Sequence, residues 1–185
     1  MSRLSELMEE MCPDGVERIV LRDVVSKLVD GMHNLPHGLT SNGKYPVLSA
    51  KNIRDGRINM SADKWADDEI FSREDKRTRV KAGDVVLTIV GTIGRSAVVP
   101  ENNGILFQRS VCIMTPAPSR MMPSFLKYTL DSTDIQDWLK KNARVGAQPG
   151  IYLRQIEKLL ISVPPLPVQA EIVRILDKWA DAHNG

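Results

Sequence analysis

Apolar residues in this chain come in short blocks separated by glycine, proline and charged residues, and few blocks are long enough for a helix. The longest β-branched block covers residues 84–90, and a second one follows at 96–99. Short apolar runs bounded by glycine or proline are typical of buried strands. The pattern predicts a hairpin at the centre of the fold. Its tip contains Gly91 and Gly94, which tolerate positive φ, followed by the cation Arg95.

The same pattern analysis predicts a mixture of strands and helices elsewhere. Further strands are expected at 16–21, 45–53, 57–60, 105–107, 110–114 and 159–163, with 45–53 pairing with 57–60 and 105–107 with 110–114. Helices are expected at 2–11, at 123–130 and from 132 onwards, with shorter helical turns at 22–28, 72–75 and 151–157. Residues 29–44 predict a long irregular loop, and loops of this length often have a function.

A helix with one apolar face ends the sequence, after a proline-rich boundary at 164–167. Its apolar positions are Val168, Ile172, Ile175, Leu176 and Trp179. We expect them to pack against a partner helix in this chain or in another. The sequence therefore predicts a domain at 1–163 and the start of a separate helix at 164–185. The predicted fold class is α+β, with a mostly antiparallel or mixed β core, peripheral helices and a protruding C-terminal helix.

The composition fits a folded protein with one main domain, because 42% of the 185 residues are hydrophobic and 26% are charged. The two cysteines, Cys12 and Cys112, form no redox or metal motif, which favours a location in the reducing cytoplasm. No stretch predicts a membrane span or a signal peptide. The net charge is only +2, but segments 73–81 and 140–158 each contain five Lys or Arg residues. Such clusters are candidates for binding a polyanion.

No catalytic motif is complete in this sequence. Residues 38–44 match part of a phosphate-binding loop, but a strand rather than a helix is predicted to follow. His33 and His37 would share a metal on a helix, which the neighbouring glycines and proline disfavour. Glu74 and Lys76 have the spacing of a nuclease motif but lie in a polar run without an apolar strand. We therefore expect a binding protein with no catalytic or metal-binding residues.

Several segments, taken in order, resemble the specificity (DNA-recognition) subunit of type I restriction–modification enzymes. The similar segments are 11–17 with 21–24, the hairpin 45–58, the central motif 81–88 with 91–94, the loops 108–111 and 146–151, and the strand and helix at 153–178. Val168 is a departure, because the family usually has glutamate before Gln169. The similarity covers nearly the whole chain, and the order and spacing of the segments make it specific.

The resemblance implies a target-recognition domain followed by the start of the family's conserved helical region. The family's full subunit contains two such domains, each reading half of a split double-stranded DNA site. This chain would then be a fragment, or a half-length subunit that pairs through its helix with a second domain or a second copy. The resemblance also implies partner methylation subunits, which use S-adenosylmethionine, and restriction subunits, which use ATP and Mg²⁺. This chain itself is expected to hold no cofactor and to catalyse no reaction.

Reading a sequence in the major groove requires paired donors and acceptors, such as arginine for guanine and asparagine or glutamine for adenine. Lysine and arginine also hold phosphates without selecting sequence. Loops predicted at strand ends supply both kinds of side chain. The candidate DNA-binding residues are Lys44, Tyr45, Lys51, Asn52, Arg54, Arg95, Gln108, Arg109, Arg144 and Gln148.

Two other functions fit parts of the sequence. A protein-interaction adaptor would use the apolar face of the C-terminal helix, and its globular domain would bind a partner other than DNA. A metal-dependent nuclease would depend on Glu74 and Lys76 alone. Removal of Arg95 and Arg109 distinguishes DNA recognition from the adaptor function, because it weakens DNA binding only if the globular domain recognises DNA.

Overall fold

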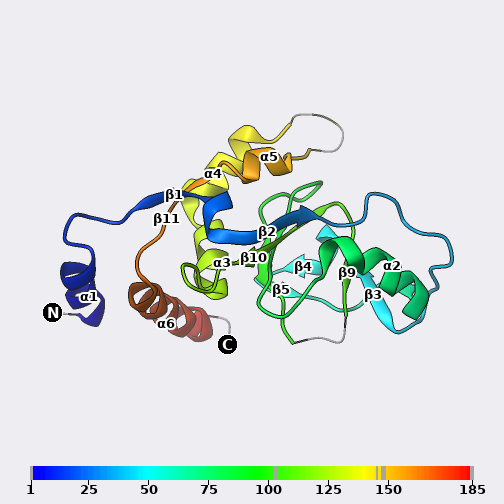
Figure 1. Cartoon of the computed structure of the whole chain (residues 1–185), viewed down its shortest axis with the longest axis horizontal. Coiled ribbons are helices and arrows are strands. Elements are labelled where there is room, and N and C mark those ends of the chain that lie inside the picture. Colours follow the sequence, from blue (N-terminus) through cyan, green and yellow to red (C-terminus); the bar gives the residue numbers. More distant parts are fainter. Residues whose placement is uncertain (1, 102–103, 145, 147–148, 184–185) are drawn as a thin grey trace.

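A four-stranded antiparallel sheet forms the centre of the structure, a computed structural model that describes residues 2–101, 104–144, 146 and 149–183 (Figure 1). Its strands, in spatial order, are β2 (Val25–Asp30), β10 (Val111–Pro116), β7 (Val85–Thr88) and β8 (Ser96–Val98). β7 and β8 form the predicted hairpin, with Val86 opposite Ala97. Every residue of β7 and β10 is buried, because both strands have neighbours on each side and both faces of the sheet are covered.

The two faces of the central sheet support two separate cores. Along β7, Val85 and Leu87 contribute to one core and Val86 to the other, as the two-residue repeat of a strand requires. The first face packs against α3 (Pro123–Asp131), α4 (Thr133–Asn142), α5 (Leu153–Ile156), β1 (Arg18–Val20) and β11 (Leu160–Ser162). The second face packs against Leu48 and Phe107, which belong to a smaller sheet.

This smaller sheet has mixed strand directions. Its strands are β6 (Trp65–Ala66), β3 (Tyr45–Leu48) and β9 (Leu106–Phe107), with β3 antiparallel to β6 and parallel to β9. Next to it, β4 (Ile53–Arg54) and β5 (Arg57–Ile58) form a hairpin whose turn residues Asp55 and Gly56 have positive φ. β1 and β11 pair separately. The predicted α+β class with a mixed β core is confirmed.

The predicted pairing of 105–107 with 110–114 is wrong. β9 pairs with β3, whereas β10 is inserted between β2 and β7. The connection at 108–110 carries the chain from one sheet to the other, and its backbone donors are satisfied on the way. The N–H of Gln108 donates to the Leu48 carbonyl (2.8 Å), and the N–H of Arg109 donates to the Met32 carbonyl (2.8 Å).

A 3₁₀ turn, η2 (Ala50–Asn52), interrupts the predicted strand 45–53. The side-chain oxygen of Asn52 accepts a hydrogen bond from the N–H of Ser49 (3.0 Å), which closes the turn. Of the predicted strand, only Ile53–Arg54 pair with β5. Local side-chain hydrogen bonds of this kind compete with strand pairing.

The helix α2 (Asp68–Thr78) begins earlier than the predicted cap at Ser72. The Asp67 carboxylate accepts a hydrogen bond from the N–H of Ile70 (2.8 Å) and so caps the first turn. Of the helical turn predicted at 22–28, only residues 22–24 are helical, as part of η1 (Leu21–Val24). The strand β2 starts directly after it.

The first and last helices lie together at one end of the molecule (Figure 1). α1 (Arg3–Met11) begins at the predicted Ser2 cap, and Leu7 of α1 packs with Val168 of α6 (Leu166–His183). The start of α6 is therefore covered within this chain, while the proposed domain boundary at residue 163 stays a prediction. Within the described part of the chain, no helix is long and apolar enough to cross a bilayer.

A buried ion pair holds one end of the central sheet together. Lys27 Nζ lies 2.8 Å from Asp84 Oδ2, and the Asp84 side chain is fully buried. The second Asp84 oxygen accepts a hydrogen bond from the Thr115 hydroxyl (2.6 Å), and Lys27 also donates to the Thr78 carbonyl (2.7 Å). The pair thus joins β2, β10, the start of β7 and the end of α2.

We expect Lys27→Met to lower the free energy of unfolding by about 3 kcal/mol or more, because it leaves the Asp84 carboxylate buried without its counter-ion. Lys51→Met is the matched control. It removes an ion pair with Asp63 in which both side chains are exposed, and it should cost less than about 1 kcal/mol. Urea unfolding followed by circular dichroism measures both changes. Equal, small losses for the two variants would contradict this role for the buried pair.

Candidate nucleic-acid interface

Several loops meet at one end of the central sheet, opposite the buried ion pair. Asp30 ends β2 and lies opposite Cys112, near the start of β10. Thr88 ends β7 and lies opposite Val111, and β8 begins at the same end. This arrangement follows from the antiparallel order, in which the end of one strand lies beside the start of the next. We term this region the loop edge; it comprises residues 30–33, 89–95, 108–110 and 149–152, together with Arg144.

Backbone hydrogen bonds hold these loops against one another. The N–H of Gly91 donates to the Pro149 carbonyl (2.9 Å), and the N–H of Ile151 donates to the Ile89 carbonyl (2.9 Å). Gly91 has a φ of 79°, a conformation that favours glycine at the hairpin tip. The loops are therefore fixed in position relative to the sheet.

Four predicted DNA-binding residues belong to the loop edge. They are Arg95, Gln108, Arg109 and Arg144. Arg109 and Arg144 are exposed, whereas Arg95 and Gln108 are half-buried. Arg144 is held there because its N–H donates to the Gly150 carbonyl (2.9 Å). Gln148, also predicted, lies outside the described residues.

Lys51 and Arg54, two further predicted residues, flank the loop edge. The guanidinium of Arg95 reaches the Ile53 carbonyl (3.4 Å), which places the β4–β5 hairpin next to the edge. Arg54 is exposed at this hairpin, and Lys51 is exposed but paired with Asp63. Both positions are compatible with a contact to an extended ligand.

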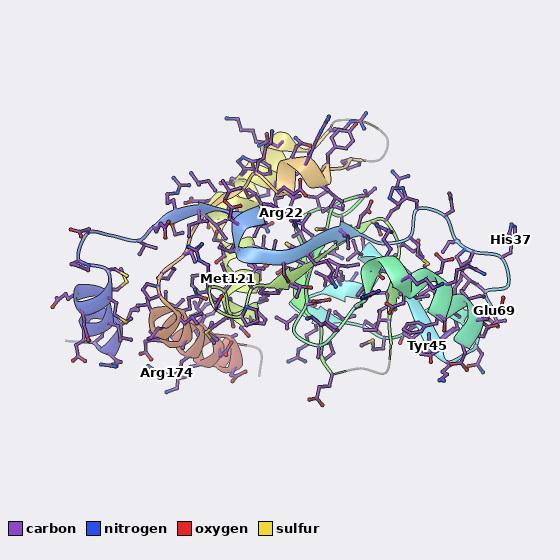
Figure 2. All side chains as sticks on the ribbon, in the orientation of Figure 1. Arg22, His37, Tyr45, Glu69, Met121 and Arg174 are labelled. Carbon is purple, nitrogen blue, oxygen red and sulfur yellow. The ribbon has the colours of Figure 1, made fainter. Side chains whose placement is uncertain are left out.

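Lys44 and Tyr45 lie at the opposite end of β3 from the loop edge, so the structure separates them from the other candidates. The Lys44 ammonium and the Tyr45 hydroxyl both bind the Asp68 carboxylate, at 2.6 and 2.8 Å. The hydrogen bond with Asp68 raises the pKa of Lys44. The Tyr45 ring is buried and stacked on Phe71 (3.9 Å between centroids). In Figure 2, Tyr45 lies near Glu69, at the end of the molecule formed by α2. These two residues hold α2 away from the loop edge, and a DNA contact by either of them stays a prediction.

Asn52 is also a structural residue. Only 4% of it is exposed. Its amide nitrogen donates to the carbonyls of Asn59 (3.1 Å) and Ser61 (2.9 Å), and its oxygen is used within η2. Because these bonds use its donors and its acceptor, the side chain has no pair of groups left to offer to a base.

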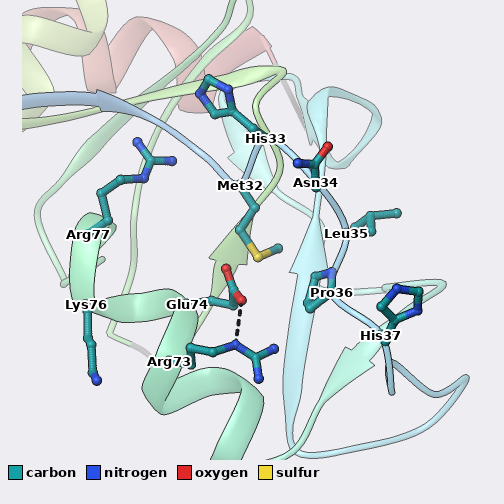
Figure 3. Close-up of a pocket in the computed structure, with 10 residues that line it drawn as sticks. All are labelled: Met32, His33, Asn34, Leu35, Pro36, His37, Arg73, Glu74, Lys76 and Arg77. Atoms are coloured by element: carbon teal, nitrogen blue, oxygen red, sulfur yellow. Dashed lines mark hydrogen bonds and ion pairs between the residues drawn. The ribbon is translucent and has the colours of Figure 1, made fainter.

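A basic groove of about 810 Å³ lies between α2 and the irregular segment 32–37 (Figure 3). Its cations are Arg73, Lys76 and Arg77, and His33 and His37 line the other side. These residues are not among the DNA-binding residues predicted from the sequence, although the charge cluster at 73–81 indicated them. The helix brings them onto one face because Arg73, Lys76 and Arg77 follow a spacing of three and four residues.

A second groove of about 540 Å³ adjoins the first and shares His33 with it. Arg109 and Arg154 line it, together with Asp30 and Tyr152. Asp30 is neutralised by Arg77 of the first groove at 3.0 Å. The two grooves therefore form one continuous surface on which cations exceed acids.

An exposed tyrosine at the second groove is accompanied by two arginines. Tyr152 is 45% exposed, and the guanidinium carbons of Arg144 and Arg154 lie 5.0 and 5.2 Å from its ring centroid, within the range of a cation–π contact. Among the described residues, no carboxylate pairs with Arg95, Arg109, Arg144 or Arg154. Guanidinium groups held in place without a counter-ion are suited to phosphate.

The residues considered for metal chemistry have other surroundings. Glu74 lies on α2 and accepts a hydrogen bond from Arg73 at 3.0 Å. Within residues 2–101, 104–144, 146 and 149–183, no three His, Cys, Asp or Glu side chains are grouped to hold a metal ion.

The two halves of the apolar face of α6 differ in how far they are exposed to solvent. Val168 and Ile172 pack against α1, and Leu176 is half-buried. Ile175 and Trp179 are 39% and 62% exposed. The expected partner helix is therefore α1 for the first half of the stripe, while the second half faces outward.

The sequence profile of the type I restriction modification DNA specificity domain matches residues 13–184 of this chain. The chain is also similar to the type I restriction enzyme EcoBI specificity subunit of Escherichia coli, with 25% identity over 160 residues. That alignment covers 84% of this chain and 34% of the E. coli protein.

Two solved structures share the fold. The S subunit of a type I restriction-modification system from M. genitalium has a TM-score of 0.64 and 16% identity, over 89% of this chain and 39% of that chain. The HsdS subunit from Thermoanaerobacter tengcongensis has a TM-score of 0.63 and 21% identity, over 97% of this chain and 43% of that chain. The chain thus spans less than half the length of these relatives.

Arg144→Ala combined with Arg154→Ala should weaken binding to duplex DNA and lower the slope of log K against log salt by about 1 for each arginine that holds a phosphate. Lys44→Ala is the matched control, because Lys44 is an exposed cation remote from the loop edge. Fluorescence anisotropy over a salt titration measures both slopes. A slope unchanged in the double variant, or lowered equally in the control, would contradict the interface.

Proposed function

Because this chain belongs to the type I restriction modification DNA specificity domain family, we propose that it recognises one half of a bipartite DNA target for a type I restriction–modification complex. The observation that carries this proposal is the loop edge. Arg109 and Arg154 line one groove there, Arg144 and Arg154 flank Tyr152, and Arg95 lies at the tip of the β7–β8 hairpin. Within the described residues none of the four pairs with an acid, which supports a site for an extended anion.

The groups on this surface divide into two kinds of contact. Lys76, Arg144 and Arg154 are cations at the rim of the grooves and suit phosphates, which fix the register of the protein on DNA. Gln108 and Arg109 lie between the two sheets at the centre of the edge and have the paired hydrogen-bonding groups that base edges require. We assign sequence reading to these central residues and positioning to the rim.

The remaining parts of the complex are assigned to other chains. The end of α6 that carries Ile175, which is 39% exposed, is proposed to pack against a second recognition domain or a second copy. Methylation subunits dock on this assembly and use S-adenosylmethionine, and restriction subunits use ATP and Mg²⁺. In this proposal the chain acts in the cytoplasm, binds no cofactor and contributes recognition alone. The exposed apolar residues of α6 also fit an adaptor without DNA binding, which is the alternative function.

Arg95→Ala combined with Arg109→Ala distinguishes the two functions. In the complex assembled with its methylation subunits, we expect the double variant to lose at least about tenfold in affinity for the target, since a good bidentate base contact contributes about 1–3 kcal/mol. Affinity for random duplex should fall much less. Binding of the methylation subunit should be unchanged, and Lys44→Ala should match the wild type.

Competition gel shifts with target and random duplex measure these affinities at physiological salt. The target is obtained beforehand by mapping methylated adenines in the host genome. Undiminished target binding by the double variant contradicts the assignment of base reading. Wild-type binding that ignores sequence rejects DNA recognition and leaves the adaptor.

A further inference from the structure

The side chain of Gln169, at the start of α6, is fully buried and makes three hydrogen bonds. Its oxygen accepts from the N–H of Met122 (2.9 Å). Its nitrogen donates to the carbonyls of Arg120 (2.7 Å) and Pro164 (2.8 Å). One carboxamide thus joins three backbone segments: the first turn of α6, Pro164 in the segment that leads into this helix, and the strand-to-helix connection that leads into α3.

The carboxamide is the group that these partners require. A glutamine side chain offers two donors and an acceptor at one terminus. Glutamate of the same length has no amide donors for the two carbonyls, and leucine of similar volume leaves all three backbone groups unpaired. Buried polar groups without partners are costly, so the three segments can stay together only while this side chain satisfies them.

A second contact holds α6 about two turns further along the helix. The Tyr128 hydroxyl of α3 donates to the Asp177 carboxylate of α6 (2.6 Å). Burial, followed by this hydrogen bond, raises the pKa of Tyr128 to about 12. The tyrosine therefore stays protonated and able to donate at neutral pH. Two contacts separated along one helix restrict its direction, which a single contact would not.

The helix α3, which receives these contacts together with the connection before it, is itself fixed to the central sheet. Asp131 of α3 accepts a hydrogen bond from Ser96 of β8 (2.5 Å) and pairs with Lys127 (3.0 Å). Ser96 adjoins Arg95 on the loop edge. The path from the loop edge to α6 therefore consists of a strand, one packed helix and the two contacts described above.

We propose that Gln169 is a positioning residue that fixes the direction in which α6 leaves the domain, and thereby the orientation of the next recognition unit relative to the loop edge. The part concerning the next unit rests on the proposed function; the fixed direction of α6 does not. The proposal makes the separation of two DNA half sites depend on a buried amide six residues before the exposed Ile175 of the same helix.

The direction of α6 can be measured by double electron–electron resonance in the 185-residue chain. Spin labels are placed through Lys158→Cys, next to β11, and Lys178→Cys, on α6, both at exposed positions. The background carries Cys12→Ser. Cys112 is retained, because burial raises the pKa of its thiol and keeps it unreactive. Labelled chain is diluted into an excess of unlabelled chain, so that only distances within one molecule are recorded.

We expect one narrow distance distribution for the parent chain and a broad or shifted one for Gln169→Leu. Gln136→Leu is the matched control. It removes an amide that also donates to two backbone carbonyls, those of Gly94 (2.8 Å) and Leu130 (2.7 Å), but that does not contact α6. Its distribution should stay narrow. If circular dichroism shows that Gln169→Leu does not fold, the distance distribution of Gln169→Glu is measured instead. A broad or shifted distribution is expected for that variant as well.

A narrow, unshifted distribution in the folded Gln169 variant overturns the proposal, and so does equal broadening in Gln136→Leu. The effect on DNA binding is tested in a separate experiment. In the assembled complex, binding is measured on duplexes whose half sites are moved apart one base pair at a time, and the variant should lose the preference of the wild type for one separation. If the wild type itself has no such preference while the distances behave as expected, the proposed function fails and the positioning role of Gln169 stands.

Discussion

The buried ion pair between Lys27 and Asp84 is the constraint on which the arrangement of the molecule depends. It joins β2, β7 and β10 at one end of the central sheet and holds the end of α2 there. The connections between strands that carry cations lie at the other end of the sheet, where the antiparallel strand order places them. A charge buried without its partner is strongly destabilising, so this end of the sheet cannot open without a large loss of stability.

The cations described above fall into two groups, according to whether they form an ion pair with a carboxylate. Lys27, Lys44 and Arg77 bind carboxylates and hold elements together. Arg109 and Arg144, by contrast, lie on the loop edge and make no ion pair in the described part of the chain. The small net charge of +2 hides this division. Local distribution of charge, more than its total, determines whether a surface attracts a polyanion.

Features encoded by local pattern could be predicted from the sequence. The β7–β8 hairpin and the stripe of α6 follow from the spacing of apolar residues. The parallel pairing of β9 with β3 could not be predicted, because it depends on which distant segment satisfies the backbone of 106–107. The same limit applies to Tyr45 and Asn52. Their chemistry suits DNA, but the Tyr45 ring is stacked on Phe71, which is distant in the sequence, and the Asn52 side chain is used in local hydrogen bonds that close a turn.

Chemical modification of arginines by phenylglyoxal, read by mass spectrometry with and without target DNA, tests most directly whether the loop edge faces the duplex. The account predicts that Arg109, Arg144 and Arg154 lose most of their reactivity when target DNA is bound. Arg174, on α6 at the end of the molecule opposite α2 (Figure 2), should react equally in both states. Protection of Arg174 with continued reactivity of the other three would contradict the account.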